Sequence, residues 1–265
     1  MRPHTPNGSP PLWLWPKLEA LMIREVHVRF AGGAGSYVWT FASPVLWIAL
    51  LVVSFEWLGR TPAILVDVPS FVASGMLPYV IFRQTVTAMG RAMSAARNLR
   101  HLGARFDDTL LAAGVLELLN ACVLFALIFS SIALIWGPTP VDAPLTAIGA
   151  VGLVALLGFS FGRLAAVLGQ VSDAANRAIP LALRPLFWVS GVFFVAAELA
   201  QPMAGWLWWN PILHASELLR TGLYDSYDSR FFDLRVPLIA SLGALATSVG
   251  VQRAAGYNIR GQALA

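Results

Sequence analysis

Long apolar stretches separated by short polar ones make up most of the chain. A helix needs about 20 mostly apolar residues to cross the hydrocarbon core of a bilayer. Stretches that approach or exceed this length occupy residues 38–57, 71–89, 110–136, 145–168, 178–197 and 236–251. The pattern predicts an all-α integral membrane protein with six transmembrane helices, in a transmembrane domain at residues 38–253.

Basic residues gather in alternate connections between these stretches. They lie before the first stretch, between the second and third, on either side of the start of the fifth, and after the last: Arg2, Lys17, Arg24, Arg29, Arg91, Arg97, Arg100, Arg105, Arg177, Arg184, Arg253 and Arg260. Cytoplasmic connections of membrane proteins carry the excess of Arg and Lys. Both ends of the chain, residues 1–37 and 254–265, are therefore predicted to be cytoplasmic, which agrees with an even number of spans.

The composition leaves no room for a soluble enzyme domain. Hydrophobic residues make up 57% of the chain and charged residues 12%, whereas soluble domains carry about 25% charged residues. The net charge of +4 is explained by arginines that set topology, so we expect no nucleic-acid partner. Lys17 is the only lysine and lacks the flanking residues of a P-loop. No cofactor is expected in this chain, and any ATP that drives it must bind to another polypeptide.

Candidate catalytic and metal sites are weak. The only cysteine is Cys122, and the four histidines are scattered without metal-ligand spacing. The sequence GFSFG at 158–162 matches the G-x-S-x-G nucleophile elbow, but Ser160 lies within a continuous apolar stretch. The same glycines form a G-x-x-x-G pair that lets two helices approach closely, so we expect helix packing there and no catalytic residue.

Two segments on the predicted cytoplasmic side are candidates for helices outside the bilayer. The stretch PKLEALMIREVHVRF at 16–30 places Leu18, Met22 and Val26 on one side of a helix, which favours a helix lying in the membrane interface over an ordinary basic flank. The basic connection at 91–108 contains good helix formers from 92 to 102. It is either a short helix that docks a partner or a solvated topology signal.

The segment from 198 to 222, between the last two stretches, contains WLWWNPILHASELLR. Asn210 followed by Pro211 is a helix-start signal, and His214 and Glu217 share a face with Asn210. The predicted helix is too short to span, so we interpret this segment as a re-entrant element on the outer side. Trp206, Trp208 and Trp209 are either an interfacial belt or stacking platforms for sugar rings.

Arg83 and Glu117 lie within apolar stretches. Each is about eight residues from the predicted cytoplasmic side, or roughly 12 Å deep. Unpaired charges at this depth are costly, so each should face a partner or a wet cavity. One interpretation is a structural ion pair, or Arg83 reaching to the surface; the other is that Arg83 lines a pathway and meets an anionic group.

Several segments together resemble the permeases of bacterial polysaccharide ABC exporters, and in particular the KpsM-like capsular polysaccharide branch. The resemblance covers nearly the whole chain and is carried by IREVHVRFAGGAGSYVWTFASPVLWIAL, LPYVIF, LLAAGVLELLNA and, most specifically, WNPILHASELLR. It implies a homodimer in the bacterial inner membrane that pairs with two copies of a separate ATPase, which binds ATP and Mg²⁺. The dimer would export a lipid-linked acidic polysaccharide towards periplasmic and outer-membrane export proteins.

The resemblance also implies roles for individual residues. The coupling helix that meets the ATPase would contain Asn98, Leu99, Arg100, His101 and Leu102. The interfacial gate helix would contain Arg24, Glu25 and Arg29, and the periplasmic re-entrant element Asn210, Pro211, His214, Glu217 and Arg220. Arg83, Glu117 and the three tryptophans are the candidate substrate-channel residues.

Other functions are compatible with parts of the pattern. Exporters of O-antigen or teichoic acid share the same broad design, as does a permease for a small lipid or drug. A membrane-bound enzyme would need an acid–base pair near a boundary, for which Glu198 with Glu217 is the available candidate. A pure assembly scaffold is poorly supported, because charged residues inside spans usually mark pathways or packing switches.

Overall fold

The computed structural model describes residues 14–30, 34–96, 106–137 and 141–255, and these form helices joined by turns, without a β-strand. The long helices are α1 (Leu14–Phe30), α2 (Ala34–Trp57), α3 (Val68–Ala96), α4 (Phe106–Trp136), α5 (Pro144–Val171) and α10 (Arg235–Ala254). Shorter elements follow α5: α6 (Asp173–Leu183), α7 (Leu186–Val189), the 3₁₀ turn η3 (Ala196–Glu198), α8 (Met203–Leu207) and α9 (Pro211–Leu223).

Three of the helices, α2, α4 and α5, have both the length and the apolar composition to cross a membrane. The 29 residues of α3 and the 20 residues of α10 span about 44 and 30 Å at 1.5 Å per residue, enough for a bilayer core of about 30 Å. Five of the six predicted stretches thus lie inside single long helices. The expected docking helix at Asn98–Leu102 lies outside the described residues.

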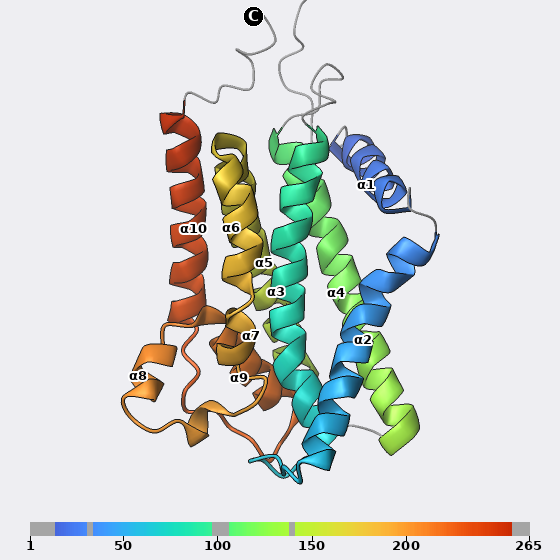
Figure 1. Cartoon of the computed structure of the whole chain (residues 1–265), viewed down its shortest axis with the longest axis vertical. Coiled ribbons are helices and arrows are strands. Elements are labelled where there is room, and N and C mark those ends of the chain that lie inside the picture. The colour runs from blue at the N-terminus through green and yellow to red at the C-terminus, as the bar shows by residue number, and fades with distance from the viewer. Residues whose placement is uncertain (1–13, 31–33, 97–105, 138–140, 256–265) are drawn as a thin grey trace, which may run out of the picture.

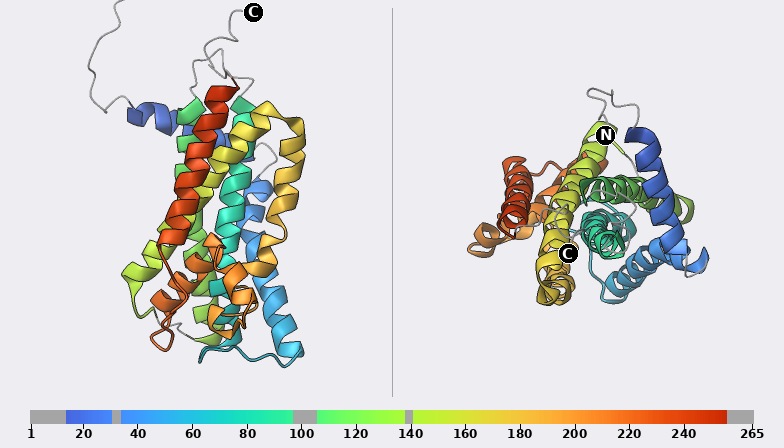
Figure 2. Two further views of the ribbon diagram at one scale, coloured as in Figure 1. Left: turned by 90° about the vertical axis from the view of Figure 1, so that its left-hand side faces the viewer. Right: turned by 90° about the horizontal axis from the view of Figure 1, so that it is seen from above.

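The long helices form a bundle around α3, which packs against α2, α4 and α5, while α10 packs on the outer side of α5 (Figure 1). The helix α1 lies across one end of this bundle, at a steep angle to the long helices and against α4 (Figure 2). We call this the α1 end. The opposite end, where α8 and α9 are found, is the α9 end.

Close packing of α3 on α5 depends on small residues. A Cβ added at Gly158 would lie 2.8 Å from the Thr85 Cβ, and a Cβ added at Gly162 would meet the Met89 side chain. Ser160, between them, is fully buried and donates to the Leu156 carbonyl at 2.8 Å within α5. The helix-packing interpretation of GFSFG is therefore confirmed.

The predicted span at 178–197 is not one continuous helix, so this expectation is corrected. Helical structure begins earlier, at Asp173, and is interrupted between α6 and α7, where Pro185 cannot donate a backbone hydrogen bond. After α7 the chain turns at Gly191, which has a φ of +81°. The apolar pattern indicated burial correctly but did not show that the backbone of residues 190–195 leaves the helix.

We predict that Gly158→Leu destabilises the protein by ~1–3 kcal/mol, because the larger side chain forces α3 and α5 apart. The control is Gly152→Leu on the same helix, where an added Cβ meets no atom within 4 Å. Thermal unfolding of both purified variants in detergent measures the effect. Equal midpoints would contradict the packing role of Gly158.

Candidate functional site

The helix α9 starts where the sequence predicts. Asn210 caps it, because the Asn210 side-chain oxygen accepts from the Ile212 backbone N–H at 3.0 Å, and Pro211 occupies the first turn. The Asn210 amide nitrogen also donates to the Val189 carbonyl at 2.7 Å. The cap therefore joins the start of α9 to the end of α7.

Arg220 is fully buried and is bound by the non-helical turn that follows α7. Its guanidinium donates to the Gly191 carbonyl at 2.6 Å and to the Phe194 carbonyl at 2.9 Å. It also lies 3.4 Å from the Ser74 hydroxyl of α3 and 4.7 Å from the centre of the Phe71 ring. In a continuous helix these two carbonyl groups would accept hydrogen bonds from backbone N–H groups. Because the chain leaves the helix after α7, Arg220 donates these hydrogen bonds instead.

Glu217, one turn earlier on α9, is also fully buried. One carboxylate oxygen accepts from the Ala196 backbone N–H at 3.1 Å and from Arg220 at 3.4 Å. The other accepts from the Ser229 hydroxyl at 2.5 Å and from the Tyr227 hydroxyl. Burial raises the pKa of Tyr227, and the Glu217 carboxylate raises it further, so the phenol stays protonated as a donor.

His214 is fully buried too and joins α9 to the segments before and after it. Its Nδ1 accepts from the Asp233 backbone N–H at 3.1 Å, and its Nε2 lies 2.7 Å from the Trp208 carbonyl, to which it donates. A single neutral tautomer satisfies both bonds. Burial lowers the pKa of His214, which favours this neutral form, and the Phe231 ring stacks on the imidazole at 5.1 Å.

The five residues predicted for the re-entrant element lie together at the start of α9 and along it, and four of them bind the neighbouring segments through their side chains. We call the five the α9 latch: Asn210, Pro211, His214, Glu217 and Arg220. The latch holds backbone groups in place. The carboxylates of the alternative enzyme site do the same, since Glu198 accepts from the Val195 N–H at 3.2 Å and Glu217 from Ala196. Among the described residues, no group of three His, Cys, Asp or Glu side chains is placed to hold a metal ion.

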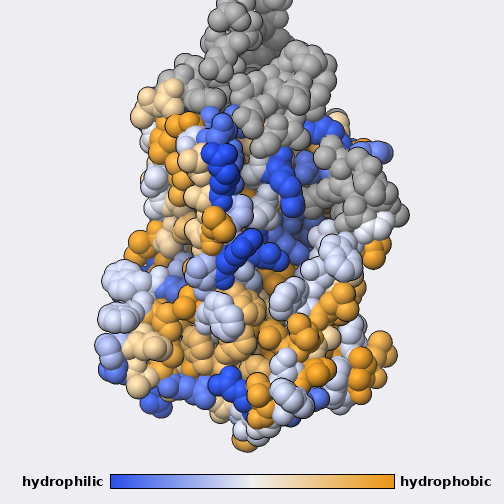
Figure 3. Space-filling model, viewed as in Figure 1, coloured by the Kyte–Doolittle hydropathy of each residue, from blue (hydrophilic) through white to orange (hydrophobic). Residues whose placement is uncertain are grey.

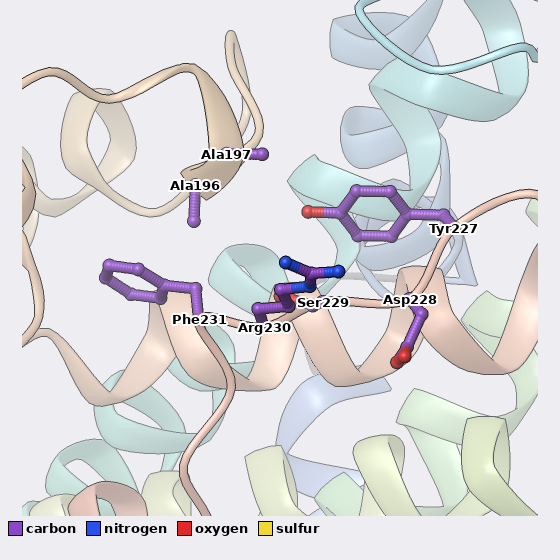
Figure 4. A pocket seen from close by; sticks show the side chains of 7 residues that line it. All are labelled: Ala196, Ala197, Tyr227, Asp228, Ser229, Arg230 and Phe231. Carbon is purple, nitrogen blue, oxygen red and sulfur yellow. The ribbon is translucent and has the colours of Figure 1, made fainter.

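A pocket of about 430 Å³ opens beside the latch, lined by Ala196, Ala197, Tyr227, Asp228, Ser229, Arg230 and Phe231 (Figure 4). The Arg230 side chain points into it between the Tyr227 and Phe231 rings, whereas the Asp228 carboxylate points away. The three tryptophans lie outside this pocket. Trp206 and Trp209 are 75% and 72% exposed, while Trp208 is half-buried and packs edge-on against Trp209 and His214.

A second polar region lies on the exposed side of α3. Arg83 and Arg91 are both exposed and, eight residues apart, lie on the same face of the helix. The Arg83 guanidinium is 5.9 Å from the centre of the Tyr79 ring. The Tyr79 hydroxyl donates to the Leu183 carbonyl at 3.3 Å, and Arg184 lies close enough to interact with Tyr79 electrostatically, as Arg83 does.

Aromatic rings continue this region towards the α9 end. The Tyr79 ring contacts Phe187 at 5.4 Å, and Phe187 contacts Trp188 at the same distance. Trp188 stacks on Phe193 at 5.0 Å and is 65% exposed. We call Arg91, Arg83, Arg184 and Trp188 the arginine–aromatic face.

In Figure 3, polar side chains gather over α3 between α6 and α2, and apolar side chains flank them. Within the described part of the chain, no carboxylate forms an ion pair with Arg83, Arg91 or Arg184. The three guanidinium groups of the face are therefore available to bind anions. Guanidinium and indole groups are not nucleophiles or acid–base catalysts, so the face is suited to binding.

The predicted pairing of Arg83 with Glu117 is not formed among the described residues. Glu117 is buried in α4, only 3% exposed, and accepts from the Asn120 amide at 3.5 Å. Arg83 points to the exposed side of α3 instead. Equal depth on consecutive helices made the pair possible, but depth does not fix the direction in which each side chain points. Of the three residues proposed for the gate helix, Arg24 and Glu25 form a 3.7 Å ion pair within α1, which also contains Arg29.

The sequence analysis did not single out Arg163 or Trp188, and it interpreted Arg184 only as a topology signal. Arg163 of α5 donates to Ser248 at 3.1 Å and Gln252 at 3.0 Å, both on α10, and pairs with Asp107 of α4. It therefore joins three helices near the α1 end. Arg163 and Arg184 both lie inside predicted apolar stretches, a signal that could have singled them out alongside Arg83.

Comparison with known proteins gives one family match. Residues 16–224 match the family described as ABC-2 type transporter. The polysialic acid transport protein KpsM of Escherichia coli is 23% identical over 237 residues, which cover 89% of this chain and 92% of KpsM.

Two further relatives cover similar shares of the chain. The capsule polysaccharide export inner-membrane protein CtrC of Neisseria meningitidis serogroup B is 25% identical over 243 residues, covering 86% of this chain and 88% of CtrC. The capsule polysaccharide export inner-membrane protein BexB of Haemophilus influenzae is 23% identical over 209 residues, covering 78% of each chain.

We predict that Arg220→Met destabilises the protein by ~3–5 kcal/mol, because it leaves Glu217 as an uncompensated buried charge. Arg230→Met is the control, since Arg230 is exposed and the loss should stay within about 0.5 kcal/mol. Thermal unfolding in detergent compares the two. Similar stability of both variants would argue against the latch.

Proposed function

Because the chain belongs to the ABC-2 type transporter family, we propose that it is the permease subunit of an ATP-driven exporter of a lipid-linked acidic capsular polysaccharide. Relatives named for polysialic acid transport and capsule polysaccharide export support this substrate class, and each covers more than three quarters of the chain. The membrane would be the bacterial inner membrane, with the α1 end at the cytoplasm.

The observation that carries the proposal is the arginine–aromatic face. Arg83 and Arg184 lie within predicted apolar stretches, and cations at that depth cannot face lipid tails without a large cost, so they require water or another protein surface. An acidic polymer would interact with Arg91, Arg83 and Arg184 in turn, and its sugar rings would pack on the exposed Trp188 ring. Successive weak sites of this kind favour conduction, because the polymer can both enter and leave.

A homodimer would enclose this face. One copy leaves Arg83, Arg91 and Trp188 exposed, and a two-fold axis beside α3 would bring the same side chains of a second copy opposite them. A pathway lined twice by arginine then lies between the copies. An exporter of a small apolar drug would not need such a lining.

The remaining segments take roles around this pathway. The helix α1 would lie along the cytoplasmic surface, and six crossings would include α6 with α7 as the fifth. Residues 198–222 would form the periplasmic re-entrant element, with Trp206 and Trp209 at the outer boundary. A separate ATPase would bind ATP and Mg²⁺ and meet the connection containing Asn98–Leu102, while periplasmic and outer-membrane proteins would receive the polymer.

We expect the triple variant Arg83→Gln, Arg91→Gln, Arg184→Gln to lose export, because the pathway loses its cations. In a host that lacks the gene, immunolabelling of the polysaccharide should show surface polymer with the wild-type chain and cytoplasmic polymer with the triple variant. The control is Arg60→Gln, Arg230→Gln, which removes two exposed arginines elsewhere. Normal surface polymer with the triple variant would refute the assigned pathway, and surface polymer without the gene would refute the function.

Contact with the ATPase is tested separately. Exchange of Leu99 and Leu102 for Glu should abolish co-purification of the ATPase, because an apolar docking surface would then carry two charges. Leu58→Glu is the control, since Leu58 is exposed and follows the end of α2 at the α9 end. Unchanged co-purification of the double variant would reject Asn98–Leu102 as the coupling segment.

A further inference from the structure

A groove of about 530 Å³ lies between α3, α5 and α6 near the α1 end. Its lining residues are Val86, Thr87, Gly90, Arg91, Ala165, Asn176, Ile179 and Pro180. Pockets for small molecules usually enclose about 300–1,000 Å³, so the groove is large enough for a ligand. It shares Arg91 with the arginine–aromatic face but lies far from the α9 latch.

The polarity of the groove changes along its length. Arg91 lies five residues before the end of α3 and Asn176 lies in the first turn of α6, so both are at the α1 end. Val86, Ile179 and Pro180 lie further along these helices and form apolar walls. The groove therefore has a cation at one end and a hydrocarbon surface about 5–8 Å deeper.

The groove is also open and firmly framed. The Asn176 amide donates to the Gly169 carbonyl at 2.8 Å, which fixes the start of α6 to the end of α5. A Cβ added at Gly90 would have no heavy atom within 4 Å. Arg91 is exposed, and none of the described carboxylates pairs with it. A ligand could thus enter beside Gly90 and reach Arg91 without displacing an ion pair.

We propose that this groove binds an anionic lipid, with its phosphate on Arg91 and an acyl chain along Val86, Ile179 and Pro180. The proposal rests on the proposed function for its orientation, since a cytoplasmic α1 end places Arg91 at the level of the inner-leaflet headgroups. Guanidinium groups pair well with phosphate, and the apolar walls match an acyl chain. A phospholipid of the bilayer and the lipid end of the exported polymer share this chemistry.

The first experiment uses photolabelling. The full chain is reconstituted in phosphatidylcholine vesicles that contain a trace of phosphatidylglycerol with a diazirine in its acyl chain, and labelled residues are located by mass spectrometry. Labelling should fall on α3 and α6 beside the groove. Diacylglycerol with the same diazirine should label these helices about ten-fold less, because it lacks the phosphate.

Two variants and a matched control decide the result. Gly90→Leu fills the groove and should abolish labelling, and Arg91→Gln should reduce phosphatidylglycerol labelling to the level of diacylglycerol. Gly250→Leu adds the same side chain near the same end of α10, where a Cβ also meets no atom within 4 Å, and should label as the wild type does. Equal labelling of wild type, Gly90→Leu and Arg91→Gln would overturn the proposal.

A measurement of polymer export in the Gly90→Leu variant then distinguishes the two possible lipids, a phospholipid of the bilayer and the lipid end of the polymer. If labelling and export are both lost, the groove takes the lipid end of the polymer. If labelling is lost and export persists, it takes a phospholipid of the bilayer, and both results support the lipid site. Failure of the proposed function would be seen differently, as surface polymer in the absence of the gene, and would leave the labelling unchanged.

Discussion

The structure at the α9 end depends on the buried Arg220 side chain and its partner Glu217. A bilayer provides no water for backbone N–H and C=O groups, so a non-helical segment at membrane depth needs protein partners. Arg220 binds the carbonyls of Gly191 and Phe194, and Glu217 binds the N–H of Ala196. Burial of two charges is costly, but here the carboxylate oxygens and most of the guanidinium donors are bound, and the broken helix is stabilised as a result.

The latch also fixes the position of the arginine–aromatic face. The turn held by Arg220 ends α7 beside α3, where Phe187 and Trp188 pack in line with Tyr79. This places the Leu183 carbonyl within reach of the Tyr79 hydroxyl and brings Arg184, like Arg83, within electrostatic range of Tyr79. The close approach requires a glycine, because any side chain at Gly75 would collide with the Gly191 carbonyl and the Arg220 guanidinium. The Arg220–Glu217 pair, which holds the turn after α7, therefore also positions the segment that carries Arg184 and Trp188 beside Tyr79.

Local signals in the sequence predicted much of the fold. The lengths of the apolar stretches predicted five long helices correctly. Asn210 followed by Pro211 predicted the start of α9. The spacing of Gly158 and Gly162 indicated close packing of two helices. The partners of Arg220 could not be predicted in this way. Periodicity shows which residues share a helix face but not what lies opposite, and Ser74 is 146 residues away from Arg220 in the sequence. The same limit explains why equal depth suggested an Arg83–Glu117 pair that the structure does not form.

Arginines inside the bundle divide into two groups by their partners. Arg163 binds three groups on neighbouring helices, and Arg220 binds Ser74 of α3, Glu217 of its own helix and two carbonyls of the turn after α7. Neither can take up a moving ligand without breaking contacts that hold these segments together. Arg83, Arg91 and Arg184 are exposed and form no ion pair with a described carboxylate. The described packing therefore leaves these three guanidinium groups available to an anionic ligand. The hydrogen bonds and ion pairs of an arginine within the chain, rather than its position along a helix, therefore distinguish the structural arginines, Arg220 and Arg163, from those that a ligand can reach.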